Sequence, residues 1–181
     1  MRVRLIAGEF GGRFIDCPDT SRTHPMGERI RSSLFNILGD VSGMQVLDAF
    51  AGSGAVGLEA LSRGAAMVTF VEKDRIAQKV IGQNIELLGV ADRSKLIKAS
   101  VSSWSETADS QLYDLIVADP PYHDLQLSTV AKLVRYLKPQ GLMVLSQPGR
   151  ESVPTVNGVV VVDNRSYGDA ALAFYRPEEQ K

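Results

Sequence analysis

The sequence predicts an α/β protein with a mostly parallel, doubly wound sheet, an antiparallel C-terminal edge and a small N-terminal β-hairpin. Between residues 44 and 145, short apolar strand patterns alternate with segments of helical periodicity. That alternation is typical of a parallel sheet with helices on both faces. Residues 115–118 are continuously apolar, as expected for a strand that is covered on both faces. Residues 159–162 and 171–175 indicate a closing antiparallel pair.

The N-terminal region predicts a hairpin followed by a loop and a helix. Residues 3–7 and 13–16 favour two short strands around a glycine-containing turn, and residues 17–24 have the Pro, Asp, Ser and Thr content of a loop. Pro25 suits the first turn of a helix, and Gly39 ends the helical pattern. We therefore expect an N-terminal arm over residues 1–24 and the main domain over residues 25–181.

The main domain predicts strands and helices in regular alternation. The expected strands are residues 46–47, 67–71, 95–99, 112–118 and 142–145. The expected helices between them are residues 55–61, 74–88 and 125–137, which stop at Gly64, Gly89 and Pro139.

Composition excludes several classes of protein. The length of 181 residues fits one domain, and 44% of the residues are hydrophobic. One cysteine, Cys17, cannot form an internal disulfide, and with only two histidines a structural zinc cluster is excluded, so no metal is expected. No apolar run approaches the roughly 20 residues that span a bilayer, and the start lacks the apolar stretch of a signal peptide. We expect a cytoplasmic monomer with no membrane partner.

Charge is unevenly distributed although the net charge is only −1. Residues 1–31 contain six arginines and four acidic residues, while the rest of the chain is acidic. A chance distribution of charged residues over the surface explains this unevenness as well as an arginine-rich arm does. If the arm is real, its planar bidentate donors suit phosphate groups.

A glycine-containing loop follows the first strand of the predicted sheet. Loops at the carboxyl ends of strands bind ligands in open α/β sheets, and Gly52 and Gly54 let the backbone approach a ligand closely. Glu72, at the end of the second strand, can accept hydrogen bonds from the two hydroxyls of a ribose. Gly57, inside the helix, is interpreted as a packing glycine.

Two cofactors are compatible with this loop. The three glycines match the fingerprint of dinucleotide sites, so an NAD-dependent oxidoreductase remains an alternative. However, the turn is longer than a dinucleotide turn, and Asp48 within it would repel a pyrophosphate. A carboxylate there suits a cationic ligand with an amino group, and S-adenosyl-L-methionine, which carries a sulfonium and an ammonium, is the cofactor that we expect.

The segment Asp119-Pro120-Pro121-Tyr122 ends the fourth strand, at the same edge as the glycine loop. The two prolines fix the backbone and remove two amide donors. The neighbouring backbone carbonyls and the Asp119 carboxylate can therefore accept hydrogen bonds from one planar amino group. The ring face of Tyr122, rather than its hydroxyl, is expected to stack on a base. Asp119 would act in its ionised form and would need no raised pKa.

These two motifs resemble class I methyltransferases that act on an amino nitrogen. The arginine-bearing segments 4–13 and 23–31 narrow the resemblance to the RsmD family, bacterial methyltransferases that modify guanine N2 in 16S ribosomal RNA. The glycine loop marks the superfamily, and Asp119–Tyr122 marks the amino-methylating groups. The similarity extends to residues 4–13, 23–31, 34–36, 47–64, 68–74 and 167–169. It implies a Rossmann-like, class I fold, dependent on S-adenosylmethionine, and a substrate in 16S rRNA, within the small ribosomal subunit or an assembly intermediate.

The resemblance also implies site residues. The expected catalytic residues are Asp119, Pro120 and Tyr122, and the expected cofactor contacts are Asp48, Ala49, Gly52, Ser53, Gly54, Glu72, Lys73 and Ser100. The RNA contacts are expected to be Arg4, Arg13, His24, Arg29 and Arg31, although residues 23–31 could instead form a lid on the cofactor. Two positions depart from the family pattern. His24 replaces a common arginine, and Ser100 or a backbone carbonyl stands in for an acid that binds the adenine.

Three alternatives remain open from the sequence alone. Asp-Pro-Pro-Tyr also occurs in enzymes that methylate adenine N6 in nucleic acids or glutamine in proteins. An oxidoreductase would leave Asp48 and Asp119–Tyr122 unexplained. A non-catalytic ribosome-binding module would not need Glu72 and Asp119.

Overall fold

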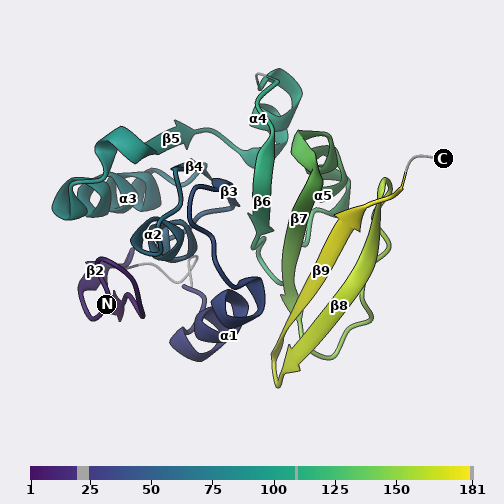
Figure 1. Ribbon diagram of the computed structural model, residues 1–181, viewed down its shortest axis with the longest axis horizontal. Helices are drawn as coiled ribbons and strands as arrows, with labels where there is room; N and C mark the ends of the chain where they lie inside the picture. The colour runs from purple at the N-terminus through teal and green to yellow at the C-terminus, as the bar shows by residue number, and fades with distance from the viewer. Residues whose placement is uncertain (20–24, 109, 180–181) are drawn as a thin grey trace.

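The computed structural model describes residues 1–19, 25–108 and 110–179. Its main sheet has the strand order β5-β4-β3-β6-β7-β9-β8 (Figure 1). The strands are β3 (Gln45–Ala49), β4 (Met67–Glu72), β5 (Ser94–Lys98), β6 (Tyr113–Ala118), β7 (Leu137–Pro148), β8 (Val159–Tyr167) and β9 (Ala170–Pro177). The ladders from β5 to β7 are parallel, and β9 is antiparallel to both of its neighbours. The predicted fold class is confirmed.

Helices cover both faces of this sheet and bury alternate residues of its strands. On one face, α1 (Glu28–Leu38), α2 (Ala55–Ser62) and α3 (Arg75–Leu88) pack in a core cluster with Val46 and Val117. On the other, α4 (Val101–Thr107) and α5 (Leu127–Leu133) pack with Leu47 and Ile116. Two 3-10 turns, η1 (Ala91–Arg93) and η2 (Val134–Tyr136), complete the described elements. Among these helices, none combines the length and apolar character needed to cross a membrane.

Several elements differ from the sequence prediction: among others, β8 extends to Tyr167 and α1 starts at Glu28 rather than Pro25. Helix α4 was not predicted from the sequence, because it has only seven residues, mostly polar, and buries just Val101 and Ser105. The helix expected over residues 125–137 is shorter and ends in η2. Strand β7 is longer than predicted because it runs through Pro139, which lies where the register with β6 shifts and the ladder needs no amide donor.

The N-terminal hairpin forms a separate two-stranded sheet of β1 (Arg2–Arg4) and β2 (Phe14–Asp16). It lies beside α2 and α3 rather than extending the main sheet (Figure 1). The first strand is shorter than predicted, because the amides of Ile6 and Ala7 donate to the Glu59 carboxylate at 2.8 and 3.2 Å. Ser62 also accepts from the Phe10 amide at 2.9 Å. The predicted arm is therefore tied to the body by α2.

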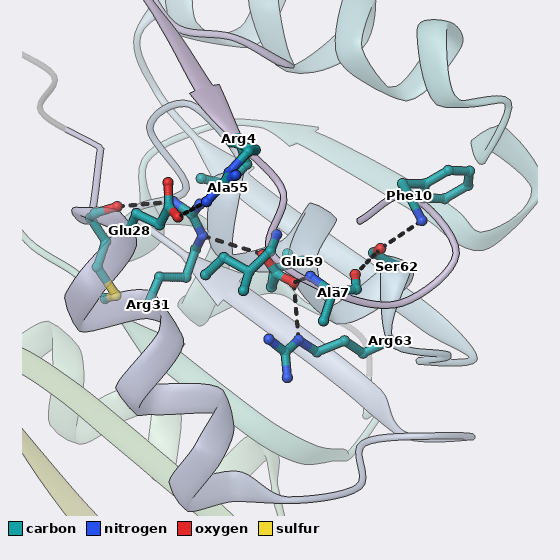
Figure 2. A network of polar contacts seen from close by, with 12 residues as sticks. Arg4, Ala7, Phe10, Glu28, Arg31, Ala55, Glu59, Ser62 and Arg63 are labelled. Carbon is teal, nitrogen blue, oxygen red and sulfur yellow. Dashed lines mark hydrogen bonds and ion pairs between the residues drawn. The ribbon is translucent and has the colours of Figure 1, made fainter. Parts of the chain in front are cut away.

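A buried ion pair joins α1 to α2 beneath the hairpin (Figure 2). Arg31 and Glu59 are both 0% exposed, and Nε of Arg31 lies 3.5 Å from Oε1 of Glu59. Arg31 also donates to the carbonyls of Met26, at 3.1 Å, and Arg4. The sequence predicts Arg31 at an RNA surface. A side chain without exposed surface cannot lie there, so that prediction is wrong, and Arg31 instead fixes α1, α2 and the hairpin relative to one another.

Candidate functional site

A cleft of about 1370 Å³ opens at the carboxyl ends of the parallel strands. It lies where β3 and β6 are neighbours and the strand order reverses, which is the switch point where open α/β sheets bind ligands. Small-molecule pockets have volumes of about 300–1,000 Å³. The cleft can therefore hold a nucleotide-sized cofactor and a second group beside it.

Most of the predicted cofactor and catalytic residues gather around this cleft. Those among its lining residues are Asp48, Gly52, Ser53, Glu72, Lys73, Ser100, Asp119, Pro120 and Tyr122. Ala49 is fully buried in β3, and Gly54 is the N-cap of α2, so both support the cleft without lining it. Ser100 also caps α4, where its hydroxyl accepts from the Ser103 amide at 3.1 Å.

The glycine loop turns sharply between β3 and α2. Three of its residues have positive φ: Phe50 at 59°, Gly52 at 59° and Gly54 at 80°. Glycine adopts this conformation readily, but a bulky residue such as Phe50 does so only where its surroundings hold it. The amide of Ala51 donates to the Val71 carbonyl at 3.1 Å and ties the loop to β4. Phe50 lines the cleft, and no local sequence signal revealed its strained backbone.

Asp48 is a buried carboxyl at the base of the loop. Its Oδ2 accepts from the Gly57 amide at 3.0 Å. Burial raises the pKa of Asp48 well above its usual range, the carboxyls of Asp119 and Glu72 add to the rise, and the hydrogen bond from Gly57 opposes it. A cationic ligand beside Asp48 would favour the charged carboxylate.

Glu72 ends β4 and lies beside the glycine loop in the cleft lining. Its two carboxylate oxygens accept from the amides of Gly52, at 3.3 Å, and Lys73, at 3.1 Å. Burial raises the pKa of Glu72, and these backbone hydrogen bonds oppose the rise. Because a carboxylate has about four acceptor sites, Glu72 keeps capacity for the two hydroxyls of a ribose.

The charge of the cleft decides between the two cofactors weighed above. Among the described lining residues, the carboxyl groups of Asp48, Glu72, Asp74 and Asp119 outnumber the cations of Lys73 and Arg75. An excess of carboxylates disfavours a pyrophosphate and favours a ligand that carries positive charge. The residues present therefore fit S-adenosylmethionine better than NAD.

Asp119 follows β6 and begins the Asp-Pro-Pro-Tyr loop. Its amide donates to the Ala49 carbonyl at 3.3 Å, which holds the loop against β3. Burial raises the pKa of Asp119 to about 6, and a side-chain hydrogen bond from Ser146 opposes the rise. The sequence analysis expected an ionised Asp119 that needs no raised pKa; the pKa is raised, and about nine in ten Asp119 side chains are still ionised at pH 7.

Tyr122 leaves its ring accessible in the cleft, with 40% of the residue exposed. Its hydroxyl lies 2.8 Å from the Oγ of Ser146, a β7 residue that is only 2% exposed. Burial raises the pKa of Tyr122. Ser146 is a site residue that the sequence analysis missed, although a serine that ends the apolar run of β7 was a usable signal.

Of the predicted RNA contacts that the structure describes, none is among the residues lining the cleft. Arg4 pairs with Glu28, which raises the pKa of the guanidinium. The guanidinium of Arg13 lies 5.7 Å from the centre of the Phe10 ring, and Arg29 is exposed on α1. His24 lies outside the described residues. Pro25, Met26, Gly27 and Ile30, which immediately follow or flank these positions, line one rim of the cleft.

The strand order and the cleft at its switch point define the fold of the class I methyltransferases. The chain belongs to the RsmD family, whose model, described as Conserved hypothetical protein 95, matches residues 3–176. Ribosomal RNA small subunit methyltransferase D of Escherichia coli is 32% identical over 184 residues, 99% of this chain and 92% of that one.

Two further comparisons show the same relationship. Putative rRNA methyltransferase YlbH of Bacillus subtilis is 28% identical and covers 96% of this chain and 98% of its own length. The solved structure of putative methyltransferase yhhF from Escherichia coli superposes with a TM-score of 0.87 at 30% identity, covering 99% of this chain and all of that one. The family resemblance inferred from the motifs is confirmed.

Proposed function

We propose that this protein transfers a methyl group from S-adenosyl-L-methionine to the exocyclic N2 of a guanine in 16S ribosomal RNA, within the small ribosomal subunit or an assembly intermediate. One observation carries the proposal. Asp119 and Tyr122 share a single cleft with Asp48 and Glu72, so a planar amine and a cationic nucleoside cofactor can meet there. One relative named as a small-subunit rRNA methyltransferase and another named as a putative rRNA methyltransferase support the RNA substrate.

The cofactor would occupy the part of the cleft between the glycine loop and β4. Glu72 would accept from the ribose hydroxyls, and Asp48 would face the positive charge, directly or through water. Gly52, which lines the cleft, would let the backbone approach the cofactor closely, because glycine has no Cβ in the way. The cofactor supplies an electrophilic methyl group on a sulfonium.

The target base would occupy the part of the cleft next to the Asp-Pro-Pro-Tyr loop. The exposed ring of Tyr122 offers a stacking surface, which is worth about 1–3 kcal/mol per base. The Asp119 carboxylate accepts a hydrogen bond from the exocyclic amino group and orients the lone pair of its nitrogen. Catalysis of this kind consists mainly of positioning and charge stabilisation. A base in this cleft must be unpaired or flipped out of its helix.

The proton released from the nitrogen also needs an acceptor. Asp119, with a pKa of about 6, can accept it from the cationic product amine and pass it to solvent. The same residue therefore serves as hydrogen-bond acceptor before methylation and as proton acceptor afterwards.

Tritiated methyl transfer tests this function. The substrates are small subunits from a strain that lacks this activity, with large subunits and tRNA as comparison. We expect label in the RNA of small subunits for the wild type, and label reduced by about 10²–10³-fold for Asp119→Ala, as when a preorganised transition-state contact is removed.

Asp92→Ala is the matched control, because Asp92 is an exposed carboxylate in η1 outside the cleft. It should label like the wild type. Equal labelling by Asp119→Ala, or label confined to protein or tRNA, would contradict the proposed function.

A further inference from the structure

Ser146 lies between the two side chains that the proposed function assigns to the target base. Its hydroxyl is 2.8 Å from the Tyr122 hydroxyl. Leu145 pairs with Ala118 in the parallel ladder of β6 and β7, so the next residues, Ser146 and Asp119, lie side by side at the end of β6. From there the serine hydroxyl can donate to the carboxylate, which lowers the pKa of Asp119. Ser146 belongs to β7, whereas Tyr122 and Asp119 belong to the loop after β6. The serine is nearly inaccessible and lines the cleft, so its rotation is confined and water does not compete freely for its hydroxyl.

The donor directions in this group follow from its chemistry. An ionised carboxylate can only accept, so Ser146 must donate to Asp119. Having used its one proton, Ser146 must accept from Tyr122, whose phenol donates. Tyr122, Ser146 and Asp119 thus form a chain of two hydrogen bonds that ends on a charge, and each bond polarises the next.

We propose that Ser146 is a positioning residue: its hydroxyl holds the stacking ring of Tyr122 and the acceptor carboxylate of Asp119 at fixed places relative to each other. The inference rests on the proposed function, because it deepens the roles assigned there to Tyr122 and Asp119. The chain of hydrogen bonds also keeps Asp119 ionised against its burial. A base stacked on Tyr122 then presents its amine to a charged acceptor.

The other ionisable groups of the cleft act differently on Asp119. The buried carboxyl of Asp48, in β3, is repelled by the charge of Asp119, which raises the pKa of Asp48. Because repulsion between like charges is reciprocal, Asp48 also disfavours the ionised form of Asp119. Glu72 of β4 lies further along the same lining, and His123 follows Tyr122 in the loop. Lys73, Asp74 and Arg75 complete the ionisable lining on the β4 side. Within the described lining, Ser146 is therefore the group identified as opposing the burial of Asp119.

Carboxyl 13C NMR of the free protein tests the proposal without cofactor or RNA. The Asp119 signal is assigned as the one missing in Asp119→Asn, and its titration is followed in the wild type and in Ser146→Ala. Loss of one charge-assisted hydrogen bond should raise the pKa of Asp119 by about one unit. Ser166→Ala, an exposed serine of β8, is the matched control and should titrate like the wild type.

Tyr122→Phe keeps the test decisive if Ser146→Ala does not fold. Removing the phenol weakens the chain from its other end, so the pKa of Asp119 should rise by less than in Ser146→Ala but in the same direction. Ser146→Thr keeps the hydroxyl and should restore the wild-type titration if it folds. An unchanged titration in the folded Ser146→Ala, or in Tyr122→Phe when Ser146→Ala is unfolded, overturns the proposal.

Methyl transfer then separates this inference from the proposed function. Since kcat/KM reports the ionisation of the free enzyme, a one-unit shift should make Ser146→Ala about fivefold slower than the wild type at pH 6. At pH 8.5 the carboxyl is ionised in both, so the part of the difference that comes from ionisation should disappear, and the difference that remains measures the loss of positioning. A wild-type enzyme without methyl transfer would refute the proposed function but leave the NMR result intact, whereas equal pH profiles would refute the role of Ser146 alone.

Discussion

At the scale of single residues, burial gives the carboxyls of this cleft their properties. Asp48, Glu72 and Asp119 all have raised pKa values, in each case chiefly because of burial. Buried carboxyl groups are unfavourable for stability when charged, and ligands that bring positive charge or donors compensate for this. The motifs predicted which residues would meet, but a raised pKa depends on how deeply each side chain lies. It could not be predicted from spacing.

Glu72→Gln should weaken binding of S-adenosylhomocysteine by roughly 1–3 kcal/mol, because a charged acceptor for the ribose hydroxyls is lost. Because the pKa of Glu72 is raised, wild-type affinity should fall as the pH is lowered toward that pKa, and the variant should lack this part of the pH dependence. Calorimetry at several pH values measures both effects. Saturable binding of NAD together with no response to S-adenosylhomocysteine would refute the assignment of the cleft.

Asp119→Asn should stabilise the free protein while abolishing its activity. The folded state raises the pKa of Asp119 from 3.8 to about 6, so it binds the proton more tightly than the unfolded state does. Stability therefore falls as the pH rises from about 4 through 6. The variant has no carboxyl to titrate at this position. Its free energy of unfolding should exceed that of the wild type by roughly 1–3 kcal/mol at pH 8 and by much less at pH 4. Urea unfolding at both pH values measures the gain, and an equal effect at pH 4 and pH 8 would contradict it.

At the scale of elements, helix α2 connects the cleft to the rest of the molecule. Its N-terminus receives the glycine loop, while Glu59 and Ser62 near its C-terminus bind the hairpin and, through Arg31, helix α1 (Figure 2). Periodicity predicted α2 and its loop. It did not reveal these roles, because a buried Glu59 looks like any polar residue of a helix until its partners are placed.

The two helical glycines should respond oppositely to alanine. A Cβ on Gly57 would lie 2.3 Å from the Phe70 ring, while a Cβ on Gly82 in α3 would meet nothing closer than Leu96 at 4.0 Å. Gly57→Ala should destabilise by about 1–3 kcal/mol, because the rigid ring must move. Gly82→Ala should stabilise by about 0.5–1 kcal/mol, because alanine favours the helix. Thermal unfolding of both variants measures this, and a stable Gly57→Ala would show that the contact between α2 and β4 yields easily.

At the scale of the whole molecule, the sequence predicted the doubly wound sheet and the gathering of its motifs, because strand ends of a parallel sheet meet at one edge. The sequence analysis did not predict the features that depend on contacts between residues distant in the chain. Arg31 belongs to the same arginine-rich segment as Arg29, yet packing buries one and leaves the other exposed. Ser146 was missed because its partners are 24 residues away or more.

Of the arginines predicted to contact RNA, Arg4, Arg13 and Arg29 are still expected to bind its phosphates. Arg13→Gln with Arg29→Gln should reduce the slope of log affinity against log salt by about 0.7–0.9 for each lost phosphate contact. Arg4→Gln should have a smaller effect, because Glu28 already pairs with that guanidinium. Filter binding to small-subunit RNA at several salt concentrations measures the slopes. Affinity for S-adenosylhomocysteine should stay unchanged, and its loss with a constant salt slope would reassign these residues to a lid on the cofactor.

The identity of the methylated nucleoside tests the central claim most directly. Small subunits from a strain that lacks this activity are incubated with the protein and S-adenosylmethionine, and their RNA is digested and analysed by mass spectrometry. We expect N2-methylguanosine in the 16S rRNA, at about one per subunit, formed by Asp119→Ala at a rate about 10²–10³-fold lower. N6-methyladenosine, or a methyl group on ribosomal protein with none in the RNA, would contradict the account.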